Sequence, residues 1–367
     1  MQKRSISQYL DEESAGPVHR AHVGPGAGAP AAHAAPVASR VRFAEHDGPA
    51  FDSGGASYHL AGAPDQVSTD FHNALARSPE MAVAVAAIKA LTNVIQRSKA
   101  QTMMGLEKEL KEAAASLERC NETAISLKAG CQLFLRYTTR TSALDAEDFE
   151  AAKRRIIKRG TYFAETSVRA RAKIADLGAP FIRPGARVLT HGHSRVVLAL
   201  LRRAVAQGIQ FSVVVTEGRP DETGLAMARD LHELGVPVIA ILDSAVAFAL
   251  ERLRVDLVLL GAEGVVENGG VINKLGTYQI ALAAAAHNTP FYVAAESYKF
   301  ARLYPLSQSD LPLERQHVDF TPRLPANVVV ENPSRDYTPP KYISLLFTDL
   351  GVLTPAAVSD ELIQLYS

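Results

Sequence analysis

The sequence lacks the features that set unusual protein classes apart. Only two of its 367 residues are cysteines, and these two, Cys120 and Cys131, lie at a spacing that matches no metal-ligand pattern. This excludes a disulfide framework and favours free thiols in a reducing compartment. Lys and Arg together number 39, as do Asp and Glu, so no net charge attracts the chain to nucleic acid or to an anionic membrane.

Long apolar runs are also missing. No stretch approaches the roughly 18 uncharged apolar residues of a membrane-spanning helix, and the start, MQKRSISQYLDEES, lacks the hydrophobic segment of a signal peptide. We therefore expect a cytosolic protein. Hydrophobic residues nevertheless make up 47% of the chain, which is enough for a sizeable core.

The composition changes twice along the chain. Residues 15–66 consist mainly of Ala, Gly, Pro, Ser and His without any period, so residues 1–67 are predicted to form a disordered tail. Its irregularly spaced histidines favour a solvated linker over a metal site. Residues 68–180 show helical patterns and are predicted to form a helical domain, whose first clear helix start is Ser78-Pro79-Glu80.

The spacing of the apolar residues changes again after Pro184-Gly185. Short Val/Leu/Ile runs alternate with helical stretches, which is typical of βαβ units around a parallel sheet. Such strands are buried on both faces and therefore read as unbroken apolar runs. The sequence thus predicts an α/β fold, in which the helical domain is followed by a Rossmann-like domain over residues 181–367.

Polar residues follow the first two predicted strands, at the edge where ligands of such sheets bind. The candidates for ligand binding here are Thr190, His191, His193, Ser194, Arg195, Thr216, Glu217 and Arg219. Ser194 is expected to cap the helix over 195–207, whose amino end, together with Arg195, suits a phosphate. A cap and a polar turn without a ligand remain the alternative. Zinc is disfavoured because His191 and His193 lack further ligands.

A second candidate segment is GAEGVVENGGVINKLGTYQ, residues 261–279. Asn268-Gly269-Gly270 permits a tight turn, which lets Glu263 and Lys274 face one cavity. A carboxylate, an ammonium and the amide of Asn273 together could bind a sugar hydroxyl and a phosphate. The alternative is a structural hairpin in which Lys274 pairs with Glu263.

Several segments carry a family resemblance, among them LTHGHSRVVLALL, FSVVVTEGRPDETG, PFYVAAESYKFARLYPL and ISLLFTDLGVLTPAAVSDELI. Over about residues 70–367 they resemble the alpha-subunit family of translation initiation factor 2B, the guanine-nucleotide exchange factor for initiation factor 2. That family is similar in fold to isomerases of methylthioribose 1-phosphate and ribose 1,5-bisphosphate.

The resemblance implies a regulatory subunit and not an enzyme. The isomerases carry a catalytic cysteine where this chain has Gly192 and a catalytic aspartate where it has Glu263. No catalytic residue, metal or required cofactor is therefore expected. The anion-binding scaffold persists and implies a pocket for a sugar phosphate or a nucleoside monophosphate. An active sugar-phosphate isomerase and a free-standing metabolite sensor stay open as alternatives.

The resemblance also implies partners. It implies a homodimer that joins beta, gamma, delta and epsilon subunits, and a helical domain that helps to sense the phosphorylated alpha subunit of initiation factor 2 in the integrated stress response. Direct contact with nucleic acid or membrane is not expected. Thr102 is the candidate for contact with the phosphorylated partner. The interface candidates are Phe300, Tyr304, Leu346 and Phe347, because aromatic and Leu side chains are common in interface cores. Ordinary core packing is the alternative for these four.

Overall fold

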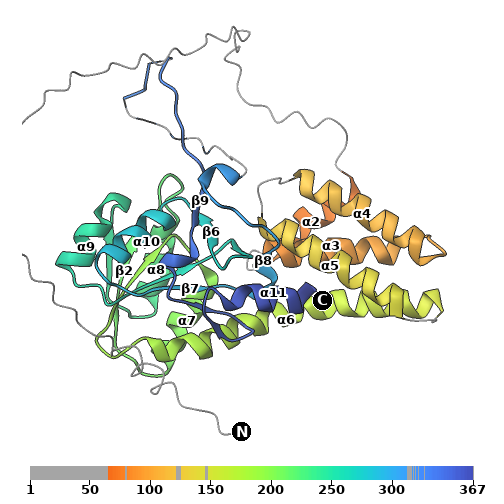
Figure 1. Cartoon of the computed structure of the whole chain (residues 1–367), viewed down its shortest axis with the longest axis horizontal. Coiled ribbons are helices and arrows are strands. Elements are labelled where there is room, and N and C mark those ends of the chain that lie inside the picture. The colour runs from red at the N-terminus through yellow and green to blue at the C-terminus, as the bar shows by residue number, and fades with distance from the viewer. Residues whose placement is uncertain are drawn as a thin grey trace, which may run out of the picture. The chain divides into compact units, whose positions relative to one another are not determined.

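The structure is a computed structural model that describes residues 65–366, except for 79–80, 121–124, 145–147 and several positions between 312 and 326. The predicted disordered tail lies outside the described residues up to residue 64. Its last two residues, Gln66 and Val67, already belong to a helix, in which Val67 and Phe71 are buried. Figure 1 shows the helical part and the sheet part of the described residues.

Five helices build the amino-terminal part from residue 65 onward, where the description begins: α2 (Gln66–Arg77), α3 (Val83–Arg97), α4 (Met103–Cys120), α5 (Ile125–Leu144) and α6 (Phe149–Gly178). Alanine and β-branched residues make most of α3 apolar, so the other helices pack around it and bury Leu91 and Ile95 completely. The predicted start at Ser78-Pro79-Glu80 is wrong: Pro79 and Glu80 lie outside the described residues, and α3 begins only at Val83 because Ala82 before it is extended.

Helix α6 has 30 residues and continues from the helical part into the sheet part. Its last turns carry Ile174 and Ala175 into the same core as Val188 and Val197. The helix is followed by one 3-10 turn, Ala179–Phe181, before the first strand. Helix α6 therefore runs from the helical part into the sheet part (Figure 1), and it contributes Ile156 to the core of the first and Ile174 to a core of the second.

The main sheet has seven strands in the order β11-β10-β7-β4-β1-β2-β3. These strands are β1 (Arg187–His191), β2 (Ser212–Thr216), β3 (Val238–Ile241), β4 (Leu257–Gly261), β7 (Phe291–Ala294), β10 (Leu345–Phe347) and β11 (Val352–Leu353). All neighbours are parallel except β10 and β11. The chain order reverses at β1, which lies between β4 and β2, and such a switch point opens a crevice at the strand ends.

The helices of this part are α7 (Arg195–Ala206), α8 (Thr223–Glu233), α9 (Val246–Arg252), α10 (Thr277–Ala286) and α11 (Ala357–Tyr366). Two hydrophobic cores each include residues from strands of the main sheet. One includes residues of α9, α10 and α11, and the other residues of α6, α7 and α8. The short 3-10 helices are Asp243–Ala245, Ser297–Lys299, Gln308–Asp310 and Pro340–Tyr342. The predicted α/β fold with a helical amino-terminal part is confirmed.

A second sheet was not predicted. It has four strands in the order β8-β5-β6-β9, namely β5 (Gly264–Val266), β6 (Val271–Lys274), β8 (Phe300–Ala301) and β9 (Arg335–Thr338). Strands β5 and β6 form an antiparallel hairpin whose turn contains Gly269 at a φ of +83°. Asn268 closes this turn, because its Oδ1 accepts a 2.9 Å hydrogen bond from the Gly270 N–H. The hairpin brings Asn273 and Lys274 to the sheet end where β1 also ends.

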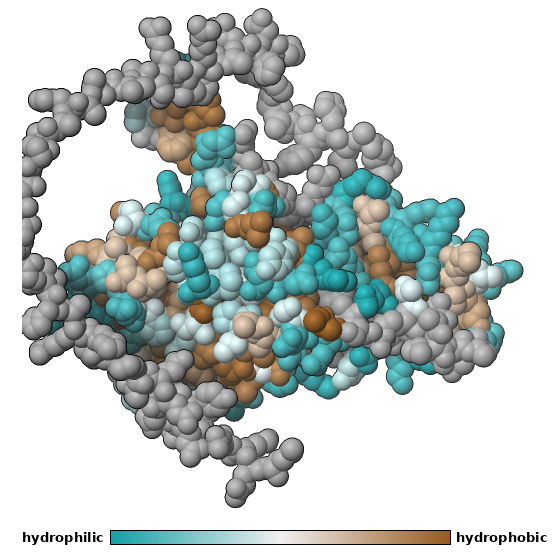
Figure 2. All heavy atoms as spheres, viewed as in Figure 1, coloured by the Kyte–Doolittle hydropathy of each residue, from teal (hydrophilic) through white to brown (hydrophobic). Residues whose placement is uncertain are grey.

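Three of the four predicted interface residues are core residues. Phe300, Leu346 and Phe347 are at most 1% exposed, so the prediction is wrong for them and ordinary packing is the correct interpretation. Tyr304 is 63% exposed and stays a prediction. Figure 2 shows apolar side chains reaching the surface in several separate patches on this face. Within the described part of the chain, every helix is too short or too polar to cross a bilayer.

Candidate functional site

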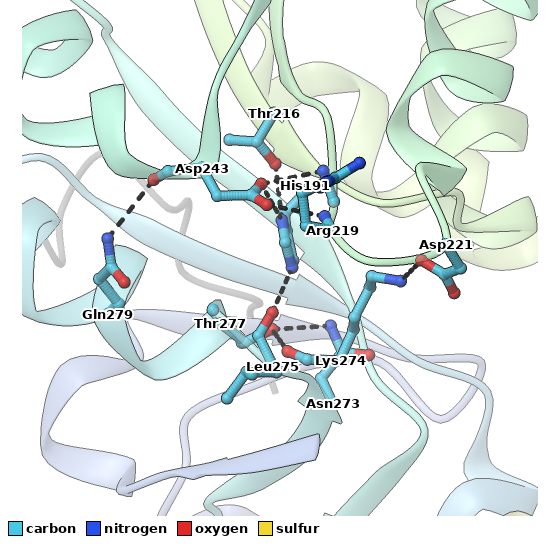
Figure 3. A network of polar contacts seen from close by, with 12 residues as sticks. His191, Thr216, Arg219, Asp221, Asp243, Asn273, Lys274, Leu275, Thr277 and Gln279 are labelled. Carbon is cyan, nitrogen blue, oxygen red and sulfur yellow. Dashed lines mark hydrogen bonds and ion pairs between the residues drawn. The ribbon is translucent and has the colours of Figure 1, made fainter. Parts of the chain in front are cut away.

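The ring of His191, at the end of β1, is buried and held from both sides (Figure 3). Its Nε2 lies 2.9 Å from the Leu275 carbonyl oxygen, and its Nδ1 lies 2.6 Å from Thr216 Oγ1. A carbonyl can only accept, so Nε2 donates to Leu275 and Nδ1 accepts from the Thr216 hydroxyl. Burial lowers the pKa of His191, which keeps the ring neutral. His191 therefore ties β1 to β2 and to the end of the hairpin.

His193 does not share this environment. Its Nε2 lies 2.8 Å from Asp230 Oδ2 on α8, so the two histidines point toward different partners. Among the described residues, no group of three or more His, Cys, Asp or Glu side chains could hold a metal ion. The His-Gly-His stretch is thus a turn between a strand and a helix, with Gly192 at a φ of +63°.

Ser194 caps α7 as predicted, since its Oγ accepts a hydrogen bond of 3.5 Å from the Val197 N–H. Arg195 was expected to reinforce an anion site at this helix end. Its Nη1 instead donates to the Met81 carbonyl oxygen at 3.0 Å, and so connects α7 to the residues before α3. Thr190 is fully buried and precedes this turn within β1.

The loop after β2 is organised by Asp243. The carboxylate of Asp243 accepts hydrogen bonds from the backbone N–H groups of Gly218 and Arg219, at 2.9 and 2.7 Å. The guanidinium of Arg219 donates to Glu222 at 2.6 Å, and the Arg219-Pro220 peptide bond is cis. Glu217, half-buried, begins this loop. The predicted residue Arg219 is therefore held by the carboxylate of Asp243, which was not among the predicted ligand-binding residues.

Lys274 and Asn273 end strand β6 beside Gly192. A side chain on Gly192 would meet Lys274 Cδ at 3.3 Å, so the lysine stem lies over the glycine turn. The Lys274 ammonium forms an ion pair with Asp221 (Figure 3). Asn273 Nδ2 donates to Thr277 Oγ1 at 3.1 Å, which fixes the turn into α10.

Glu263 lies apart from Lys274. Its carboxylate pairs with Arg335 on β9. The alternative interpretation, in which Lys274 pairs with Glu263, is therefore wrong, although the hairpin itself is present. Both charged groups are neutralised by residues from other segments, Asp221 and Arg335, which sequence reasoning missed.

Asp336 caps α10 from outside the helix. Its Oδ2 accepts hydrogen bonds from the N–H groups of Gly276 and Tyr278, at 2.8 and 3.0 Å. Burial raises the pKa of Asp336 to about 7, against the opposing effect of these two bonds. The residue also lines a cavity of ≈ 1140 Å³ between the loop after β2, α10 and β9. Its wall further includes Arg219, Asp243 and Arg335.

The chain thus has a helical amino-terminal part followed by a Rossmann-like domain. In that domain, polar residues gather at the strand ends beside a switch point. This arrangement defines the class of protein. The chain belongs to the initiation factor 2 subunit family, whose model matches residues 76–355. It is 45% identical over 313 residues to translation initiation factor eIF2B subunit alpha of Dictyostelium discoideum, covering 82% of this chain and 97% of that protein.

The chain is also similar to an isomerase and to a solved structure. The chain is 35% identical to ribose 1,5-bisphosphate isomerase of Pyrococcus furiosus, over 76% of this chain and 86% of that protein. The crystal structure of translation initiation factor eIF-2B from Pyrococcus horikoshii OT3 matches with a TM-score of 0.63 and 26% identity, over 80% of this chain and 98% of that one. The predicted family resemblance is confirmed.

Proposed function

We propose that this chain is a non-catalytic regulatory subunit of translation initiation factor 2B. The observation that carries the proposal is the 45% identity to an alpha subunit over almost the whole length of that relative. The site supports the same conclusion, because Gly192 offers no nucleophile and Glu263 is engaged by Arg335. In this role the chain works through assembly with other subunits of the factor and not through turnover.

The finer parts of the role are these. The chain forms a homodimer in the cytosol, joins beta, gamma, delta and epsilon subunits, and helps to sense the phosphorylated alpha subunit of initiation factor 2 during the stress response. Thr102 is the proposed contact with that partner: it is exposed, and its Oγ1 accepts from the Gly105 N–H at 3.2 Å at the start of α4. A side chain that a partner contacts must be accessible in this way.

Affinity purification of the tagged full chain from its own cells tests the assembly. Beta and delta subunits should copurify in stoichiometric amounts, and addition of the chain should make nucleotide exchange sensitive to phosphorylated initiation factor 2. A chain that purifies alone and leaves exchange unchanged would instead support a free-standing sensor. Thr102→Arg should weaken the response to the phosphorylated partner without dissociating the complex.

We further propose that the strand ends retain a pocket for a phosphorylated metabolite, either a sugar phosphate or a nucleoside monophosphate. The supporting features are the Gly192 turn, the amino end of α7 and the largely buried Lys274 ammonium beside it. Isothermal titration with ribose 5-phosphate and adenosine monophosphate tests this pocket. Binding that is lost in Lys274→Met supports the pocket, and no binding at millimolar ligand contradicts it.

The second candidate is a sugar-phosphate isomerase, which the 35% identity to ribose 1,5-bisphosphate isomerase favours. The empty nucleophile position opposes it. Conversion of ribose 1,5-bisphosphate by the purified chain, at a rate abolished by Glu263→Gln, would establish the enzyme instead of the regulatory subunit.

A further inference from the structure

The side chain of Lys274 lies across two glycine turns. A Cβ on Gly192 would meet Lys274 Cδ at 3.3 Å, and a Cβ on Gly218 would meet Lys274 Cε at 3.4 Å. The stem therefore fits into the space that these two glycines leave, and its ammonium reaches Asp221 beyond them (Figure 3). The ion pair joins the end of β6 to the loop after β2, which are 53 residues apart in sequence.

The loop that carries Asp221 has supports of its own. Asp243 accepts from two of its N–H groups, at Gly218 and Arg219, and Glu222 accepts from the Arg219 guanidinium. Asp221 is therefore presented to Lys274 by a loop whose backbone does not depend on the ion pair. Replacing Asp221 should remove one charge and leave the loop in place.

Exposure shows which partner faces the solvent. The Lys274 side chain is 15% exposed and the Asp221 side chain 41%. The carboxylate thus covers the ammonium from the outside. On the other side, Thr223 Oγ1 lies 3.3 Å from the Cβ position of Gly192, so the space beside the turn is also bounded there. An anion that approaches Lys274 from solvent must compete with Asp221.

We propose that Asp221 is an internal competitor for the anion at Lys274, and that it raises the affinity that any anion needs to occupy the site, so that phosphate monoesters occupy it at concentrations at which carboxylates do not. This inference rests on the phosphate pocket proposed above. A phosphate monoester carries nearly two charges and three acceptor oxygens near neutral pH, so it displaces a single carboxylate from the lysine. A ligand carboxylate has the same charge as Asp221 and gains nothing by the exchange.

Isothermal titration of the full chain compares two probes, ribose 5-phosphate and ribonate, which share a sugar skeleton and differ in the anion. Asp221→Asn should bind ribose 5-phosphate about two- to five-fold more tightly, the range expected for loss of a partly exposed ion pair. Its affinity for ribonate should rise by a similar factor, because the internal carboxylate lowers the apparent affinity for both anions to the same extent. Lys274→Met should bind neither probe.

Asp176→Asn is the matched control, because Asp176 pairs with Arg203 in an exposed ion pair between α6 and α7. It should bind both probes as the original chain does. If Asp221→Asn and the original chain bind ribose 5-phosphate with equal affinity, the competitor role of Asp221 is contradicted, while the phosphate pocket is still supported. If neither the original chain nor Asp221→Asn binds either probe, both the phosphate pocket and the competitor role of Asp221 are contradicted. Hydrogen exchange over residues 217–222 verifies that the loop of Asp221→Asn stays folded.

Discussion

Arg171 on α6 donates a 3.0 Å hydrogen bond from Nε to Oε1 of Glu296, which follows β7. This joins the long helix to the end of a sheet strand. The second oxygen of Glu296 forms a 2.9 Å ion pair with Lys299, and the Glu296 side chain is only 2% exposed. Although burial opposes ionisation, Lys299 and Arg171 lower the pKa of Glu296 to about 2. The ionised carboxylate is therefore an integral part of the folded state.

Glu296→Gln should lower the free energy of unfolding by about 3–5 kcal/mol at pH 7, because it leaves buried cationic groups without their counter-charge. The original chain should also lose stability as the pH falls from about 4.5 toward 2, since the unfolded carboxyl binds its proton first. The variant should lack this component of acid unfolding. Urea unfolding between pH 3 and 7 measures both effects, and Asp176→Asn, with an exposed pair, should change stability by less than about 1 kcal/mol.

The contribution of Asp336 to stability should depend on pH in the opposite sense to that of Glu296. Its pKa is raised to about 7 from an ordinary 3.8, so the folded state holds the proton more tightly than the unfolded chain. Stability should then fall as the pH rises from about 4 to about 7. The full displacement corresponds to at most about 4 kcal/mol. Asp336→Asn should remove this loss, so its stability relative to the original chain should improve steadily between pH 4.5 and 8 in urea unfolding. Parallel curves for the two proteins would contradict this assignment.

Gly261, at the end of β4, touches the cap of α7. A Cβ there would meet Ser194 Oγ at 2.3 Å and Ser194 Cβ at 2.9 Å. Gly261→Ala should therefore cost about 1–3 kcal/mol from overpacking, and Ser194→Ala about 1 kcal/mol from loss of the cap. The double variant should be more stable than the sum of the two losses predicts, because the worst clash is gone. Thermal unfolding of the original chain, the two single variants and the double variant completes a double-mutant cycle. Strict additivity of the two losses would mean that the two sites do not interact.

Local features of the sequence predicted local structure well. Ser194 was identifiable as a cap because it directly follows an apolar strand and precedes a helical period, and the structure has that hydrogen bond. The second sheet was not predictable in the same way. Strand β9 has only four residues, Arg335–Thr338, and pairs with β6 from more than sixty positions away. Nothing in so short a polar stretch distinguishes a strand from a loop.

Charge partners were the least predictable part of the site. Lys274 and Glu263 are close in sequence and opposite in charge, yet each pairs with a residue from a distant segment, Asp221 or Arg335. Residue type also failed to separate core from interface. Phe347 and Tyr304 both lie in aromatic and leucine-rich stretches, but only the strand position of Phe347 places it inside the molecule.

Gly192 offers the sharpest test of the lost chemistry. Its φ of +63° disfavours any side chain, and a Cβ would press on Lys274 and Thr223 at 3.3 Å. Gly192→Ala and Gly192→Cys should each lower the free energy of unfolding by about 1–2 kcal/mol for the left-handed backbone alone. We expect Gly192→Cys to remain inactive toward ribose 1,5-bisphosphate, because Glu263 stands where the related isomerases carry the shorter aspartate and its carboxylate is paired with Arg335. Isomerase activity in Gly192→Cys that Glu263→Gln abolishes would show that the thiol alone was missing.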